Sequence, residues 1–212
     1  MMNFNNISTL IFDLGGVLLN LDKPRCVANF EKIGIHVMED LLSLTHQQGF
    51  ILDFELGNIT TSEFRNRLRG YADREVTDQQ IDAAWNSFLV NIPNEKLELL
   101  KQLKTKFKIL MLSNTNDLSF NHTVDTMINV NGNRLEDYFD KCYLSYKLHL
   151  AKPHREIFDY LLKDAGVKAE NCLFIDDGAS NIEAAKALGF NTYFAKVHED
   201  LHPVFESITS HR

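Results

Sequence analysis

Three short apolar runs in the sequence each end abruptly in polar or acidic residues. The runs occupy residues 10–12, 109–112 and 172–175, and the residues that follow them are Asp13, Ser113 with Asn114, and Asp176 with Asp177. None of the runs alternates apolar with polar residues, which is typical of strands that are covered on both faces. Such strands occur in parallel sheets packed between helices, so this recurring pattern restricts the chain to few folds.

Helical patterns lie between the predicted strands. They extend from Pro93 to Phe107, from Pro153 to a cap at Gly166, and over residues 181–188, while two weaker strands are expected at 142–146 and 192–195. Strands that alternate with helices in this order require crossover connections. We therefore predict an α/β fold with a Rossmann-like, doubly wound parallel sheet.

The stretch from residue 23 to residue 90 interrupts this alternation and contains no convincing strand. Thr60 with Glu63, and Thr77 with Gln80, have the spacing of capping boxes ahead of helical patterns. The predicted organisation is an α/β core formed by residues 1–22 and 91–212, with an all-helical insert at residues 23–90. Because no Pro-rich or Ser-rich linker separates the two units, the hinges must be short.

Charge and cysteine content exclude several classes of protein. The 212-residue chain has 22 basic and 29 acidic side chains, a net charge of −7, which argues against nucleic acid as a partner. The apolar runs are too short to span a membrane. Cys26, Cys142 and Cys172 lie far apart without a CxxC motif, which predicts reduced thiols and no zinc site. With no export signal visible at the start, a cytoplasmic location is expected.

The polar residues after the three strands are expected to meet at one edge of the sheet. In open α/β sheets, ligands bind beyond the carboxyl ends of the strands, near the point where the strand order reverses. The three acids would form an oxygen-rich cage that suits Mg²⁺. Ser113, Asn114 and Lys152 would cover the oxygens of a phosphate group, and Asp13 would be free to attack phosphorus. Each residue alone is more often a turn former, a cap or a solvated charge, so the prediction depends on their joint order.

Four motifs, taken in order, resemble those of the haloacid dehalogenase (HAD) superfamily of aspartyl-nucleophile hydrolases. The motifs are IFDLGGVLLNLD (11–22), MLSNTN (111–116), AKP (151–153) and FIDDGASN (174–181), and their frame covers nearly the whole chain. The resemblance implies that the helical insert is a C1 cap over the active site. Within the superfamily the motifs look like those of the sugar-phosphate phosphatase branch, which includes a bacterial glucose-1-phosphatase and is close to the N-terminal phosphatase domain of epoxide hydrolases.

The same resemblance implies a role for each motif residue. The nucleophile would be Asp13, the charge-neutralising lysine Lys152, the phosphate-binding residues Ser113 and Asn114, and the Mg²⁺ ligands Asp13, Asp177, Asp176 and the backbone carbonyl of Gly15. Asn181 would either orient the acidic loop or simply begin a helix. The expected activity is therefore Mg²⁺-dependent hydrolysis of a small phosphorylated metabolite such as a sugar phosphate.

Position 15 departs from the usual pattern of the phosphatases in this superfamily. These enzymes usually carry a second Asp two residues after the nucleophile, which protonates the leaving alcohol and then activates water. General acid–base catalysis is worth about 10²–10⁴-fold, so a glycine slows such an enzyme without removing its nucleophile or metal site. Three explanations stay open: a leaving group that needs little protonation, a proton donor elsewhere such as Asp22, Asp53 or Glu55, or a weak catalyst that binds phosphorylated ligands.

The sequence leaves two alternative functions open. The superfamily's dehalogenases lack the second Asp as well, but they do not keep the adjacent acidic pair found at residues 176–177, so phosphate chemistry is favoured. A catalytically silent protein that binds phosphorylated ligands is the other alternative.

Arg25 or Asn116 is expected to contact the substrate, because Arg25 follows the nucleophile motif closely and Asn116 follows the phosphate-binding residues. A monomer and a homodimer are equally compatible with the sequence.

Overall fold

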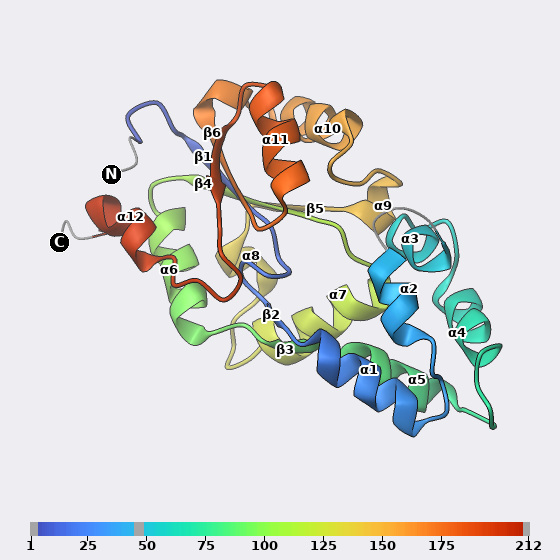
Figure 1. Ribbon diagram of the computed structural model, residues 1–212. Coiled ribbons are helices and arrows are strands. Elements are labelled where there is room, and N and C mark those ends of the chain that lie inside the picture. Colours follow the sequence, from blue (N-terminus) through green and yellow to red (C-terminus); the bar gives the residue numbers. More distant parts are fainter. Residues whose placement is uncertain (1–3, 45–48, 210–212) are drawn as a thin grey trace.

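A five-stranded parallel sheet forms the centre of the protein (Figure 1). The computed structural model describes residues 4–44 and 49–209. The strands are β1 (Thr9–Phe12), β4 (Lys108–Ser113), β5 (Lys141–Leu144), β6 (Cys172–Asp176) and β7 (Asn191–Phe194), in the order β5-β4-β1-β6-β7. After β1 the chain adds β4 and β5 on one side and then β6 and β7 on the other, so the strand order reverses at β1. The predicted α/β fold is confirmed.

Residues of the central strands alternate between two buried faces of the sheet. Helices α6 (Asn94–Lys104), α8 (Leu135–Tyr138) and α12 (His202–Thr209) cover one face, and α10 (Arg155–Ala165) and α11 (Ala179–Ala187) cover the other (Figure 1). Leu10 and Phe12 of β1 belong to the first apolar cluster, whereas Ile11 belongs to the second. The absence of alternation in the sequence is explained by this burial on both sides.

In the described part of the chain between residues 23 and 86, five helices form a separate group beside the sheet (Figure 1). They are α1 (Lys23–Lys32), α2 (Met38–Leu44), α3 (Phe50–Glu55), α4 (Thr61–Arg69) and α5 (Asp78–Asn86). They share an apolar cluster of their own, in which Phe54 and Phe64 stack with ring centroids 4.1 Å apart and Trp85 meets Phe64 edge-on. This cluster allows the group to pack independently of the sheet.

Short antiparallel strands and helix caps define the ends of these helices. Strands β2 (Asn20–Leu21) and β3 (Leu89–Asn91) pair where the chain leaves and re-enters the core. Residues 89–90, expected within the all-helical insert, are therefore extended, because Leu89 pairs with Leu21. Both expected capping boxes are present, at Thr60 and Thr77.

The helix expected to start at Pro153 begins two residues later, at Arg155. Pro153 lies in a turn that is closed by a 3.0 Å hydrogen bond from His154 N to Ala151 O, and this turn delays the helix. Gly166 ends the helix in the left-handed conformation, as expected from its position.

The strand expected at 142–146 is also shorter in the structure. It ends at Leu144, because Ser145 begins helix α9 (Ser145–Leu148) and its hydroxyl accepts a 2.9 Å hydrogen bond from Thr115 N. The other short elements are α7 (Asp117–Thr123), the π-helical turn η1 (Val124–Ile128) and the 3-10 turn η2 (Ala169–Asn171). Among the described residues, no helix combines the length and apolar character needed to cross a membrane.

Candidate active site

Three neighbouring strands bring their carboxyl ends to one edge of the sheet. Phe12 pairs with Met111 of β4 and with Ile175 of β6, so Asp13 follows β1 where β4 and β6 also end. The backbone N–H of Asp13 donates to Ile175 O over 2.9 Å, which fixes Asp13 next to the end of β6. The structure therefore brings together the polar residues that follow the three apolar runs.

The ammonium group of Lys152 links two of these acids. Its Nζ lies 2.9 Å from Asp13 Oδ1 and 2.7 Å from Asp176 Oδ2, and the lysine side chain is only 1% exposed. Burial lowers the pKa of Lys152, but the two carboxylates outweigh this effect and hold the pKa above its ordinary value. Lys152 therefore stays cationic at neutral pH.

Asp13, Asp176 and Asp177 form a compact carboxylate cluster. One oxygen atom from each of the three lies within 4.8 Å of the others. Burial raises the pKa of Asp13, against the lowering effect of Lys152, and the charges of Asp176 and Asp177 raise it further. Because three carboxylates lie this close together and the Lys152 ammonium pairs with two of them, a divalent cation among them would favour their ionised forms.

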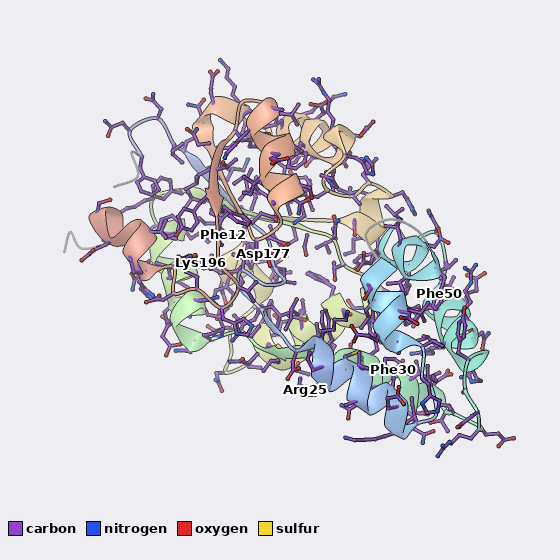
Figure 2. The ribbon with its side chains drawn as sticks, viewed as in Figure 1. Phe12, Arg25, Phe30, Phe50, Asp177 and Lys196 are labelled. Carbon is purple, nitrogen blue, oxygen red and sulfur yellow. The ribbon has the colours of Figure 1, made fainter. Side chains whose placement is uncertain are left out.

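A glycine lets Asp177 approach the loop after β1. Gly16 has a φ of +76°, and a Cβ atom there would lie 2.0 Å from Asp177 Oδ2. Both the backbone conformation and the close approach therefore require glycine at this position. Figure 2 shows Asp177 close to Phe12, the last residue of β1.

Asp176 is completely buried, and both of its carboxylate oxygens have partners. Oδ2 pairs with Lys152, while Oδ1 accepts hydrogen bonds from Gly178 N over 2.7 Å and from Asn181 Nδ2 over 2.9 Å. Asn181 lies in the first turn of α11, so it both begins a helix and holds the acidic loop.

Asn114 holds the backbone of Lys152. Its Oδ1 accepts from Lys152 N and its Nδ2 donates to Lys152 O, each over 2.9 Å. Because one Nδ2–H and the amide oxygen are used in this way, the donors that Asn114 can offer to a phosphate are its backbone N–H and the second Nδ2–H. Ser113 is buried at the end of β4 and lines the adjacent cavity.

A cavity of about 260 Å³ lies between this edge of the sheet and the helices of the insert. The core side of its lining includes Leu14, Gly15, Ser113, Asn114, Thr115 and Asn116, and the helical side includes Lys23, Leu42, Ile51, Glu55, Trp85 and Phe88. Among the described lining residues, Lys23 and Glu55 are the charged ones, and the Lys23 ammonium pairs with Glu39 over 2.8 Å. The insert therefore presents a largely apolar wall to the cavity, and Glu55 is the acidic residue among the described residues of its lining.

The two residues expected to contact substrate lie in different places. The Arg25 guanidinium donates to Ser87 O over 2.5 Å and to Leu89 O over 2.8 Å, so it ties α1 to the segment leading into β3. Figure 2 shows Arg25 at the start of α1, well apart from Asp177. Asn116 does line the cavity, but its Oδ1 accepts from Ser119 N and caps α7.

Ser145 is a buried residue near this cavity that no sequence motif identified. Its hydroxyl accepts from Thr115 N over 2.9 Å and donates to Glu55 O over 2.6 Å, so it joins the core to the end of α3. The signal available in the sequence was its position: Ser145 follows an apolar strand directly, as Asn114 does after β4.

Comparisons with known proteins identify the family. The haloacid dehalogenase-like hydrolase family matches residues 7–189. The D-ribitol-5-phosphate phosphatase of Bacteroides thetaiotaomicron is 36% identical over 187 residues, which cover 88% of this chain and 91% of that protein. A HAD family enzyme from the same organism, solved in complex with magnesium and inorganic phosphate, superposes with a TM-score of 0.90 at 45% identity, covering 94% of this chain and 99% of that one. A HAD-like hydrolase from Porphyromonas gingivalis gives a TM-score of 0.88 at 34% identity, covering 97% and 99%. The chain therefore belongs to the haloacid dehalogenase-like hydrolases, the superfamily that its four motifs resemble.

Proposed function

We propose that this protein is a magnesium-dependent phosphatase that hydrolyses a small phosphomonoester through a phosphorylated Asp13. The observation that carries the proposal is the setting of Asp13, which directly precedes the cavity-lining residues Leu14 and Gly15. Its Oδ1 accepts from Leu14 N over 2.7 Å and lies 2.9 Å from Lys152 Nζ, so the carboxylate is fixed in orientation. A carboxylate that is held and partly desolvated in this way is suited to attack phosphorus.

The carboxylate cluster fits Mg²⁺, a hard cation that prefers oxygen ligands. In the proposal Asp13 and Asp177 bind the metal, Asp176 binds it directly or through water, and the backbone carbonyl of Gly15 is a further ligand. The bound metal would offset negative charge on the phosphate and on the carboxylates. The HAD family enzyme that is 45% identical and binds magnesium and inorganic phosphate supports this choice of metal.

The chain's own residues would position the phosphoryl group and balance its charge. The Lys152 ammonium, 2.9 Å from Asp13, stabilises the negative charge that gathers as the bond from the Asp13 oxygen to phosphorus forms. The Ser113 hydroxyl and the Asn114 backbone N–H would bind phosphoryl oxygens, while the Asn114 side chain keeps Lys152 in place. Water then attacks phosphorus, which releases phosphate and restores Asp13.

We infer that the five helices of the insert act as a cap and that the substrate is a sugar or polyol phosphate. The cavity of about 260 Å³ suits a small metabolite, because sites for drug-sized ligands measure about 300–1,000 Å³. The similarity to the D-ribitol-5-phosphate phosphatase supports this substrate class.

Opening of the proposed cap would break contacts that join the helices to the core, and two of them are hydrogen bonds to residues of α7. Trp85 Nε1 donates to Ser119 Oγ over 2.9 Å, and Thr61 Oγ1 donates to Asp117 Oδ2 over 2.6 Å. In the proposal these hydrogen bonds break when the cap opens to admit the substrate, and they form again when the cap closes over it.

Phosphate release by the purified protein tests the proposed function. The panel contains ribitol phosphate, anomeric and non-anomeric sugar phosphates and an aryl phosphate, each with MgCl₂. We expect turnover that EDTA removes and that the Asp13→Asn variant lacks. A matched control is Asp159→Asn, which changes an exposed acid on α10 that pairs with Arg155. Turnover that survives EDTA, or that persists in Asp13→Asn, would contradict the mechanism.

The same preparation distinguishes the two alternative functions. If no ester is hydrolysed but sugar phosphates raise the melting temperature, the protein is a binder of phosphorylated ligands. If halide is released from a short 2-haloacid without added metal, it is a dehalogenase.

A further inference from the structure

Glu55 and Gly15 line the same cavity from opposite units of the protein. Gly15 lies in the loop directly after the nucleophile, where phosphatases of this family usually carry their second aspartate. Glu55 is the last residue of α3 in the insert. The loop after Asp13 therefore brings no acidic side chain to the cavity at position 15, whereas the insert brings Glu55.

The backbone around Glu55 is fixed to the core by three contacts. Ser145 Oγ donates to Glu55 O over 2.6 Å, and His149 Nδ1 lies 2.8 Å from Leu56 O. Gly57 packs so closely that a Cβ atom there would lie 2.2 Å from Tyr146 O. These contacts hold the end of α3 against the residues that follow β5, so the Glu55 side chain enters the cavity from a defined position.

Among the residues that the structure describes, none forms a structural contact with the Glu55 carboxyl group. Across residues 4–44 and 49–209, it makes no hydrogen bond or ion pair with another residue. Burial raises the pKa of Glu55 to about 7, with a further increase from the charge of Asp13 and a decrease from Lys152. Both the protonated and the ionised form are therefore accessible near neutral pH, which suits a group that gives and takes a proton.

The other two acids considered as proton donors have different surroundings. Asp22 caps α1, because its Oδ1 accepts from Arg25 N over 2.9 Å. The Asp53 side chain is 44% exposed and lies 3.8 Å from Arg67 NH1. Neither residue lines the cavity that Gly15 and Glu55 share.

We propose that Glu55 is the general acid and base that replaces the missing aspartate at position 15. This inference rests on the proposed phosphatase function and assigns the proton transfers of that reaction to the insert. Because Glu55 belongs to the insert, the reaction would be complete only when the five helices lie against the core.

The two half-reactions balance with one proton held by Glu55. In the first, an Asp13 oxygen bonds to phosphorus, the bond from phosphorus to the ester oxygen breaks, and protonated Glu55 gives its proton to the departing alkoxide. In the second, Glu55 carboxylate takes a proton from water as the water oxygen bonds to phosphorus and the bond from phosphorus to Asp13 breaks. The net reaction is phosphate ester plus water giving alcohol plus hydrogen phosphate, with Asp13 and Glu55 restored.

The Glu55→Gln variant tests this assignment, because glutamine keeps the size of the side chain and cannot transfer the proton. Butyl phosphate has a leaving group that needs protonation, whereas nitrophenyl phosphate does not. We expect the rate of enzyme phosphorylation to fall by about 10²–10⁴-fold with butyl phosphate and little with nitrophenyl phosphate. With nitrophenyl phosphate the variant should show a burst of nitrophenolate, followed by slow turnover as phosphorylated Asp13 accumulates.

An equal loss with both esters, or a change in KM alone, would overturn the proposal and make Glu55 a substrate-binding residue. Asp53→Asn, on the same helix, is the matched control and should keep the wild-type dependence on leaving group. If wild type hydrolyses esters through Asp13 but Glu55→Gln matches it, only this inference fails. If wild type is inactive or Asp13→Asn is active, the proposed function itself fails.

The variant Gly15→Asp provides a second test, because it restores the usual aspartate at position 15. A Cβ atom at Gly15 would lie 3.2 Å from Leu21 Cδ1, a flexible side chain, so an aspartate can be accommodated there. In the Gly15→Asp background the new carboxyl group should take over proton transfer. Glu55→Gln should then lower the rate of enzyme phosphorylation by butyl phosphate much less than it does in wild type. An equal loss of rate from Glu55→Gln in both backgrounds would contradict an acid–base role for Glu55.

Discussion

The Lys152 ammonium nitrogen lies 2.9 Å from Asp13 Oδ1, and almost none of the lysine side chain reaches solvent. The same nitrogen lies 2.7 Å from Asp176, so one cation separates two buried carboxylates. Because Asp13 and Asp176 both contact this nitrogen, their two carboxylates would repel each other if the cation were lost. Lys152 therefore has a structural effect that can be measured without any substrate.

We expect Lys152→Met to lower the free energy of unfolding by about 3 kcal/mol in EDTA, because it removes the cation that Asp13 and Asp176 share in a buried site. The loss should be smaller in saturating Mg²⁺, if the metal supplies the missing positive charge. Urea unfolding with and without the metal measures both values. Lys163→Met, an exposed lysine on α10, is the control and should cost less than about 0.5 kcal/mol. Similar losses at the two positions would show that the Lys152 pair is not stabilising.

Magnesium is expected to stabilise the folded protein through the carboxylate cluster. A metal ion that binds only the folded state at about 100 times its Kd adds about 2.7 kcal/mol of stability. The Asp177→Asn variant should lose most of this gain, because it removes one of the three clustered carboxylates. Thermal unfolding with and without MgCl₂ gives the comparison, with Asp159→Asn as the control. A full Mg²⁺ effect in Asp177→Asn would place the metal elsewhere.

The sequence predicted the sheet and its functional edge because both depend on local patterns. An apolar run that ends in Asp13 or Asp176 specifies a buried strand and the side chain at its end, and parallel pairing then brings these ends together. The side-chain partners were harder to predict, because they depend on residues distant in the chain. Arg25 follows the nucleophile motif, yet it binds backbone carbonyls near residue 88.

Asn114 and Ser145 illustrate the same limit within the site. Asn114 is paired with the backbone of Lys152, which is 38 residues away, and Ser145 reaches Glu55, which is 90 residues away. Neither contact leaves a periodic or spacing signal in the sequence. Such pairings follow only from the packing of the insert and of the loops at the sheet edge.

All three cysteine thiols are expected to be unreactive in the folded protein. Burial raises the pKa of Cys26, Cys142 and Cys172 to about 12 each, so almost no thiolate is present near neutral pH. A disulfide reagent at a pH of about 8 should therefore label the folded protein slowly and label all three cysteines rapidly in urea. Rapid labelling of any cysteine under native conditions would show that its surroundings open to solvent.

Alanine substitutions at Gly16 and Gly132 should separate backbone strain from damage to the metal site. Both glycines have positive φ, +76° and +82°, so alanine at either position should cost about 1 kcal/mol of stability. At Gly132 no atom of the described residues, apart from its chain neighbours, lies within 4 Å of the added Cβ, whereas at Gly16 the Cβ would lie 2.0 Å from Asp177 Oδ2. Gly16→Ala must therefore also displace a proposed Mg²⁺ ligand, and calorimetry should show weakened Mg²⁺ binding in this variant alone. Equal Mg²⁺ affinity in the two variants would mean that the position of Asp177 does not determine metal binding.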